Sequence, residues 1–216
     1  KIYSEQTSHH PPISDFEIYG KDDMWKCTSH CNFTIDSGMR EVDINQTGTF
    51  HLEFKDGNVY EWEFPVIQVF GIIYGDRIIR VKGPVIINDL TNNLTCIVQI
   101  QPKKDKAKGI LESVATTIYA YTYETDDKKQ VERKAIRGDY TDKLIFCEDG
   151  KVVWDITKNI ITRPLREAKR EDLLPSDSRF RLDRHFLIKG QKEAADVAKV
   201  TIEESQRREK KLRIYI

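Results

Sequence analysis

The sequence has no net charge, and this absence argues against one broad class of protein. Among its 216 residues, 35 Lys and Arg balance 35 Asp and Glu. A protein that binds nucleic acid through its phosphates usually carries a clear excess of positive charge. The chain as a whole therefore does not have the electrostatic character of a nucleic-acid-binding protein.

Cysteine is scarce and predicts neither a disulfide framework nor a metal site. The four cysteines are Cys27, Cys31, Cys96 and Cys147. No signal peptide precedes them, so we expect reduced thiols and a cytoplasmic protein. Cys27 and Cys31, with His30 between them, have metal-ligand chemistry. On a strand, however, residues four apart lie about 13 Å from each other, too far to share one ion.

Long apolar runs are also missing. A helix that crosses a bilayer needs about 20 mostly apolar residues, and no such run occurs. A chain of this length can bury a substantial core as one domain. We therefore expect a single domain without a membrane-spanning helix.

Most of the chain has the pattern of β-strands separated by short turns. Apolar and β-branched residues alternate with polar ones, and turn signals such as residues 20–23 and 55–58 divide the runs. The segment from Val66 to Val81 is unusually apolar and is broken at Gly71 and Gly75, so we expect a strand pair there that is buried on both faces. Other strands are expected at 13–19, 25–35, 42–54, 59–64, 85–87, 93–101, 113–124, 131–138, 143–146 and 152–154.

The carboxy-terminal part of the chain changes character. Asp177 or Ser178 can cap a short helical turn that reaches residues 184–185. Residues 191–213 contain no Gly or Pro and are rich in helix-forming residues, which predicts a long helix. A large antiparallel sheet followed by helices gives an α+β fold, strand-rich over 1–160 and loop-rich and helical over 161–216.

The most informative run is residues 5–12, Glu-Gln-Thr-Ser-His-His-Pro-Pro. Proline fixes its own φ and favours an extended conformation for the preceding residue, so the imidazoles of His9 and His10 are held in place. Adjacent side chains diverge on an extended segment unless the backbone turns. Held histidines can bind an anion, accept a proton or bind a metal, although no further ligands lie at chelating spacing. These residues alone leave a structural turn and a binding site as equal alternatives.

A second candidate lies in the predicted long helix. Lys199, Glu203 and Arg207 are spaced at i, i+4 and i+8 and so share one face, with Glu203 between two cations. A surface ladder of this kind stabilises a helix by only about 0.3–0.5 kcal/mol per pair. Alternatively, the two cations, held by a shared carboxylate, converge on a phosphate. The spacing by itself favours the surface ladder.

Both ends of the chain carry a resemblance to one family. Residues 5–12 resemble the fingerprint of the oxysterol-binding protein family, with Thr7 where many members have Val. Residues 60–65, 173–184 and 199–207 resemble later motifs of that family in the same order. The resemblance covers the chain from end to end.

The resemblance implies an incomplete antiparallel β-barrel that encloses a hydrophobic tunnel and is followed by carboxy-terminal helices. It implies a lipid-transfer protein that exchanges sterol for phosphatidylinositol 4-phosphate at closely apposed membranes, without a cofactor and without catalysis. The family's headgroup site, two histidines with a lysine, a glutamate and an arginine from a late helix, falls on His9, His10, Lys199, Glu203 and Arg207. Charge-assisted hydrogen bonds from such cations suit a phosphomonoester.

Three other functions stay open. The second lipid could be phosphatidylserine, or the protein could be a sensor or adaptor that holds a lipid without net transport. A phosphatase or phosphotransferase that uses His9 or His10 as nucleophile is disfavoured, because no Cys, Asp or metal-ligand set accompanies the pair.

The resemblance also implies that residues 1–216 are the carboxy-terminal part of one lipid-binding domain. In the family the fingerprint lies in mid-domain, after a lid and the first barrel strands. A barrel without its opening strands exposes an unpaired edge and part of its apolar lining. We therefore expect residues 1–216 alone to bind lipid poorly.

Overall fold

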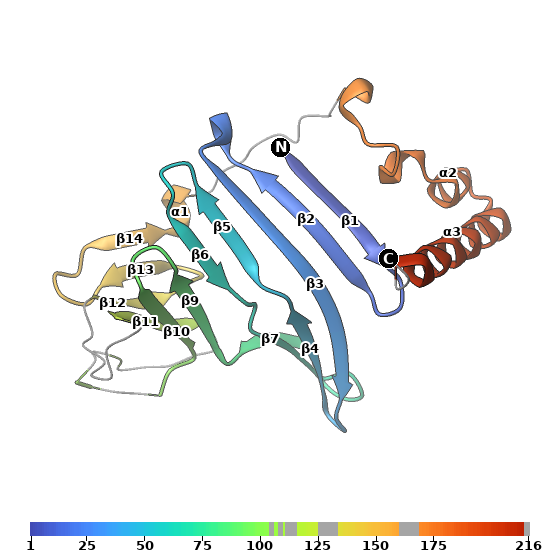
Figure 1. Ribbon diagram of the computed structural model, residues 1–216. Helices are drawn as coiled ribbons and strands as arrows, with labels where there is room; N and C mark the ends of the chain where they lie inside the picture. Colours follow the sequence, from blue (N-terminus) through green and yellow to red (C-terminus); the bar gives the residue numbers. More distant parts are fainter. Residues whose placement is uncertain (104–105, 108–109, 111–115, 125–133, 160–168, 214–216) are drawn as a thin grey trace.

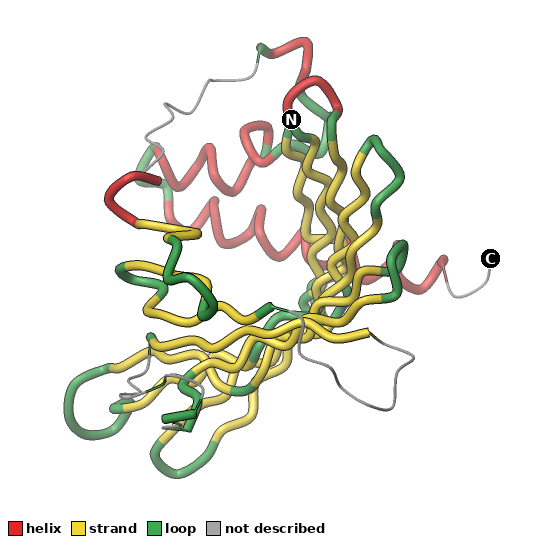
Figure 2. The backbone as a smooth tube through the Cα atoms, turned by 90° about the vertical axis from the view of Figure 1, so that its left-hand side faces the viewer, coloured by secondary structure: helices red, strands yellow, loops and turns green. Residues whose placement is uncertain are grey.

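A computed structural model describes residues 1–103, 106–107, 110, 116–124, 134–159 and 169–213. These residues form one antiparallel sheet of 14 strands, followed by helices in the carboxy-terminal part (Figure 1). The sheet is strongly twisted, so its strands run in different directions in Figure 2, and its ends do not pair to close a barrel within the described residues. The predicted α+β order and open sheet are confirmed.

The strands follow the predicted segments except at residues 2–8, where no strand was predicted. In chain order they are β1 (Ile2–Ser8), β2 (Ile13–Tyr19), β3 (Trp25–Ser37), β4 (Glu41–Thr47), β5 (Phe50–Phe54), β6 (Val59–Trp62), β7 (Val66–Phe70), β8 (Ile78–Lys82), β9 (Pro84–Asp89), β10 (Leu94–Ile100), β11 (Thr117–Glu124), β12 (Ala135–Asp139), β13 (Lys143–Phe146) and β14 (Val152–Asp155). The predicted strand residues 113–115 and 131–133, and the boundary at 160–161, lie outside the described residues.

The long strand β3 is the point where the sheet branches. One side of β3 pairs with β2, while its other side pairs with β5 along Trp25–Ser29 and with β4 along Asn32–Ser37. The predicted segment 42–54 is therefore two strands, β4 and β5. Gly48 lies between them with φ +115°, and a Cβ there would lie 1.7 Å from the backbone oxygen of His30. Only glycine fits this close approach.

The main core lies on one face of this branched region. Cys27 and Cys31 on β3 are buried with Phe50 on β5, and alternate residues of neighbouring strands pack against them. Phe50 stacks on Trp62 at 5.4 Å between ring centroids. A smaller cluster around Tyr119 lies in the second half of the sheet. The alternation of apolar and polar residues along these strands thus places the apolar side chains on one face of the sheet and the polar ones on the other.

The predicted burial of the Val66–Val81 segment is wrong. Its two strands pair antiparallel as β7 and β8, yet Ile78 and Ile79 are 57% and 71% exposed. The buried residue of the pair is polar: Gln68 is 2% exposed and accepts a hydrogen bond from Arg80 Nε at 3.0 Å. In the described sheet β8 pairs with β7 alone, so it lies at an edge. An apolar run at an edge stays exposed unless another element covers it.

The carboxy-terminal part is helical as predicted, but the single helical turn expected to reach residues 184–185 is two separate helices. Two short 3-10 helices, η2 (Arg170–Asp172) and η3 (Ser178–Phe180), precede α2 (Leu182–Ile188) and α3 (Lys192–Arg213); α1 (Ile156–Asn159) follows β14 and η1 (Lys21–Asp23) precedes β3. Asp177 caps η3 by accepting a hydrogen bond from the backbone N–H of Arg179. α2 packs against α3, and α3 contacts β1. The last helix therefore lies beside the first strand.

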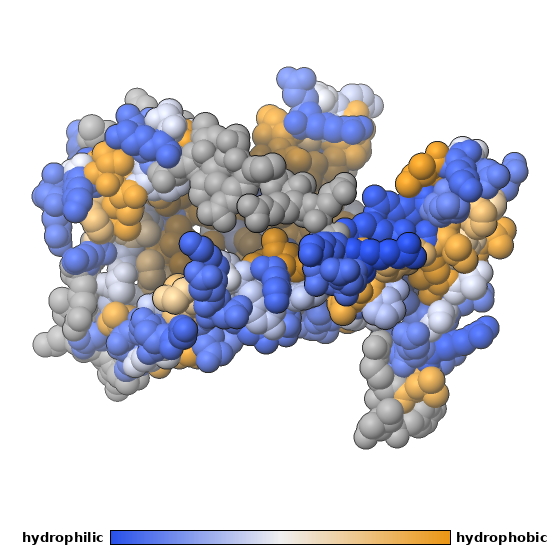
Figure 3. All heavy atoms as spheres, turned by 90° about the horizontal axis from the view of Figure 1, so that it is seen from above, coloured by the Kyte–Doolittle hydropathy of each residue, from blue (hydrophilic) through white to orange (hydrophobic). Residues whose placement is uncertain are grey.

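The helical region keeps several apolar side chains exposed. Figure 3 shows hydrophobic residues beside charged ones over this part of the molecule. On α2 and α3 they include Leu182, Leu187, Ile188 and Val197. Of the helices in the described ranges, none is long and apolar enough to cross a membrane.

Candidate functional site

The two histidines lie in the turn that joins β1 to β2. These strands pair antiparallel, and the register shifts between Gln6 and Ser8 as the chain enters the turn. The His10–Pro11 peptide bond is cis. The rings of His9 and His10 lie 4.3 Å apart between centroids and are tilted by 52°. The backbone turn therefore brings the neighbouring imidazoles together, as the paired prolines predict.

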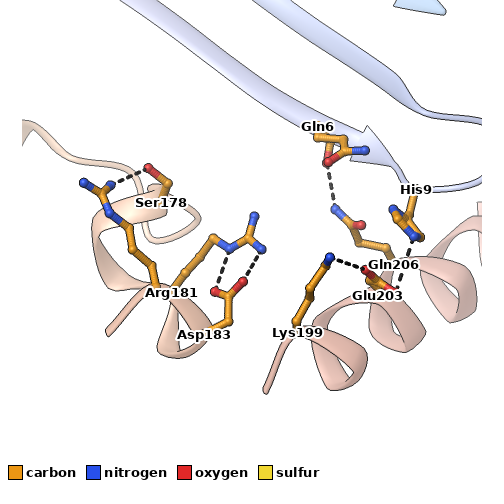
Figure 4. A network of polar contacts seen from close by, with 9 residues as sticks. Gln6, His9, Ser178, Arg181, Asp183, Lys199, Glu203 and Gln206 are labelled. Carbon is orange, nitrogen blue, oxygen red and sulfur yellow. Dashed lines mark hydrogen bonds and ion pairs between the residues drawn. The ribbon is translucent and has the colours of Figure 1, made fainter. Parts of the chain in front are cut away.

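A carboxylate from the last helix reaches this turn. Glu203 Oε2 lies 3.4 Å from His9 Nε2, and Glu203 Oε1 lies 3.9 Å from Lys199 Nζ (Figure 4). The side chain of Glu203 is only 19% exposed, whereas that of Lys199 is 59% exposed. One partly buried carboxylate thus joins an imidazole from the first hairpin to an ammonium from α3.

Arg207 does not join this cluster in the way the spacing suggests. Its side chain is exposed and makes no hydrogen bond or ion pair with the residues that the structure describes. Glu203 is indeed flanked by two basic groups, but the second is His9. Spacing of i, i+4 places two side chains on one face without forcing them to touch. Here the second oxygen of Glu203 faces the hairpin and not the next helical turn.

Two further residues join α3 to the first hairpin, one at strand β1 and one at the histidine turn, and sequence reasoning missed both. Gln206 Nε2 donates a hydrogen bond to the backbone oxygen of Gln6 at 2.7 Å. Lys210 Nζ donates one to the backbone oxygen of His10 at 2.9 Å. Helical periodicity alone could have placed them on the face of Glu203, since they follow it at i+3 and i+7. Which backbone oxygens accept these hydrogen bonds, however, cannot be predicted from the sequence.

A second ion pair lies at the start of α2. Arg181 donates to both carboxylate oxygens of Asp183, at 3.0 and 2.6 Å. These hydrogen bonds raise the pKa of Arg181, and the negative charges of Asp183 and Glu203 raise it further. The same contacts lower the pKa of Asp183. Arg181 is thus a fixed cation within the electrostatic reach of Glu203, and the sequence reasoning did not single it out.

The cluster has the chemistry of an anion-binding site. His9 and Lys199 contact the carboxylate of Glu203, and the ring of His10 lies beside that of His9. Each of these nitrogen groups can donate to phosphate oxygens. Across the described part of the chain, no group of three or more His, Cys, Asp or Glu side chains is placed to hold a metal ion. Cys27 and Cys31 instead lie buried on β3.

The open sheet, with its histidine turn beside a carboxy-terminal helix, defines a class of protein with known members. Residues 1–215 match the family model described as Oxysterol-binding protein. Because this match spans nearly the whole chain, the chain belongs to the oxysterol-binding protein family. The family predicted from the motifs is confirmed.

Curated relatives are longer than this chain. Oxysterol-binding protein 9 of Dictyostelium discoideum is 28% identical over 225 residues, which cover 97% of this chain and 51% of the relative. Oxysterol-binding protein-related protein 2B of Arabidopsis thaliana is 24% identical over 96% of this chain and 31% of its own length. The chain therefore spans about half or less of these relatives.

Solved structures share the fold. The Osh3 ORD of Saccharomyces cerevisiae, crystallised in complex with PI(4)P, matches with a TM-score of 0.70 and 18% identity over 97% of this chain and 58% of that one. The Osh1 ORD domain in complex with cholesterol matches with a TM-score of 0.68 and 20% identity over 99% and 57%. At these identities the similarity establishes the architecture.

Proposed function

We propose that this protein is a lipid-transfer protein that exchanges a sterol for phosphatidylinositol 4-phosphate between membranes. The observation that carries the proposal is the meeting of His9 and Glu203, with Lys199 on the other oxygen of the same carboxylate. A surface ladder of charges on α3 would not need a histidine from the first hairpin.

The headgroup phosphate is proposed to bind His9, His10, Lys199 and Arg207. A phosphomonoester carries roughly 1.5 to 2 negative charges near pH 7, and a nearby phosphate favours the protonated, doubly donating form of histidine. The exposed side chain of Arg207 has no ion-pair partner in the described structure and is available to a ligand. Glu203 holds Lys199 and His9 in place and can accept a hydrogen bond from an inositol hydroxyl.

The solved relatives support this choice of ligands. Two solved structures with the same fold are complexes with PI(4)P and with cholesterol. Ile67 and Ile79 are exposed apolar residues on one face of the β7–β8 pair, and they suit the lining of a lipid tunnel. We infer that residues 1–216 form the carboxy-terminal part of one lipid-binding domain that acts peripherally at membranes, from the cytoplasm, without covalent chemistry.

A transfer assay between liposomes tests the proposal. Donor liposomes carry phosphatidylinositol 4-phosphate and acceptor liposomes carry sterol, and the full-length protein is expected to move the two lipids in opposite directions, each faster when the other is present. Binding without movement would favour a sensor or adaptor. Movement that needs phosphatidylserine in place of sterol would favour that lipid as second cargo, and release of inorganic phosphate would indicate an enzyme.

A further inference from the structure

The face of α3 that carries Glu203 also carries two side chains that contact the backbone of the first hairpin, one in β1 and one in the histidine turn. We propose that Gln206 and Lys210 are positioning residues of the headgroup site, which set the distance between Glu203 and His9. This inference rests on the proposed function for its ligand. Its geometry stands on two hydrogen bonds within the chain.

The two hydrogen bonds hold the turn on both sides of His9. Gln206 binds the backbone oxygen of Gln6, before the histidine, and Lys210 binds the backbone oxygen of His10, after it. In each bond the donor and acceptor are 200 positions apart in the sequence. Helix α3 thus forms hydrogen bonds to the backbone on both sides of His9.

Because Gln206 and Lys210 lie on the same helix as Glu203, their contacts with the hairpin also fix the position of Glu203. Glu203, Gln206 and Lys210 lie at i, i+3 and i+7, so they form one stripe over about two helical turns. α3 is a continuous helix of 22 residues, Lys192–Arg213. Two anchors along its axis fix both its translation and its rotation against the hairpin, and these decide whether the Glu203 carboxylate reaches His9.

Burial separates Lys210 from the other cations at the end of α3. Lys210 and Gln206 are half-buried, whereas the neighbouring Arg208 and Lys211 are exposed. The ammonium of Lys210 is held on a backbone oxygen of the turn at 2.9 Å. A lysine that served only to add positive charge near the membrane would not need this contact. Lys211, one position later and on another side of the helix, is therefore a matched control.

Replacements at these positions separate positioning from simple charge. Lys210→Met removes the donor and the charge, Lys210→Arg restores both, and Lys211→Met removes a charge but no contact. Gln206→Met removes the other donor with little change in side-chain volume. Inositol 1,4-bisphosphate, the soluble headgroup, is the probe, titrated calorimetrically into the full-length protein at one fixed salt concentration.

Lys210→Met and Gln206→Met are each expected to weaken headgroup binding about three- to tenfold, as for the net loss of one hydrogen bond. Lys210→Arg and Lys211→Met are expected to stay within about twofold of the original chain. NMR spectra recorded without ligand report on the position of the His9 ring. Its resonances are expected to shift in Gln206→Met and in Lys210→Met, but not in Lys211→Met.

If Lys210→Met and Lys211→Met lose the same amount of headgroup affinity, charge alone matters and the positioning role is overturned. The role is also overturned if Lys210→Met and Gln206→Met both keep the affinity of the original chain. If the original protein fails to bind the headgroup, the proposed function is what fails. The His9 resonances then still decide the inference: unshifted signals in both variants would overturn it. Should Lys210→Met not fold, Gln206→Met and Lys210→Arg carry the same comparison.

Discussion

His9 Nε2 lies 3.4 Å from Glu203 Oε2, although the two residues come from the first hairpin and the last helix. The candidate site therefore exists only when the two ends of the chain are folded together. A change in either end is expected to alter anion binding while the sheet between them stays intact.

Replacing both histidines is the most direct test of the site. His9→Ala with His10→Ala in the full-length protein removes two proposed phosphate donors and leaves the apolar sheet unchanged. We expect extraction of phosphatidylinositol 4-phosphate from liposomes to fall by at least about tenfold while sterol binding is kept. His185→Ala, at an exposed histidine of α2, is the control. Equal loss of both lipids would point to misfolding instead.

Glu203→Gln tests whether the carboxylate organises the site. The amide keeps the shape of the side chain but loses the ion pairs with Lys199 and His9. We expect binding of inositol 1,4-bisphosphate to weaken by roughly three- to tenfold, because charged partners hold a side chain better than neutral ones do. Glu204→Gln, at the exposed neighbour, should have no effect. Tighter headgroup binding in Glu203→Gln would mean that the carboxylate mainly repels the phosphate.

Asp177 gives a prediction about pH. Hydrogen bonds from the side chain and backbone of Arg179 lower the pKa of its carboxyl group from 3.8 to about 2. A lowered carboxyl pKa stabilises the fold above pH 3.8, and this contribution is lost as the pH falls through about 2. NMR titration of the Asp177 carboxyl carbon should show a midpoint near pH 2, and Arg179→Met should move it towards 3.8. An unchanged midpoint in that variant would exclude the side chain of Arg179 as the cause.

Gly48 gives a prediction about stability. A Cβ at this position would overlap the backbone oxygen of His30, whereas one at Gly57, whose φ is also positive, would meet nothing within 4 Å. Gly48→Ala should cost about 3 kcal/mol or more of unfolding free energy, and Gly57→Ala about 1 kcal/mol from its backbone conformation alone. Urea denaturation of both variants checks this, and similar costs at the two sites would show that the close approach is not maintained.

The exposed apolar strands predict weak sterol uptake by residues 1–216 alone. Ile78 and Ile79 face solvent on β8, and β1 pairs only with β2 in the described sheet. A sterol bound there would stay partly in water and gain little from the transfer. Uptake of a fluorescent sterol should be much lower than for a chain extended at its amino terminus. Comparable uptake by the two chains would refute the prediction.

Local features of the sequence determined most of the secondary structure. Alternation along β2 and β13 gave these strands their predicted bounds, and the absence of Gly and Pro from residues 191–213 predicted α3 to within one residue. These signals suffice because strand and helix periodicity reflect only which face of one element is apolar. The histidine turn was predictable for the same reason, since the following prolines restrict the backbone locally.

Only the tertiary structure decided how these elements meet. In the folded structure Ile79 is exposed. Burial depends on whether another element covers a strand, and the residues of the strand alone do not show this. The tertiary structure paired Glu203 with His9 in place of Arg207, and it brought Lys210 to a backbone oxygen of the turn. A backbone acceptor is the same at every residue, so no sequence pattern marks it. The sequence therefore named the family and the candidate phosphate ligands, while folding determined which of them touch.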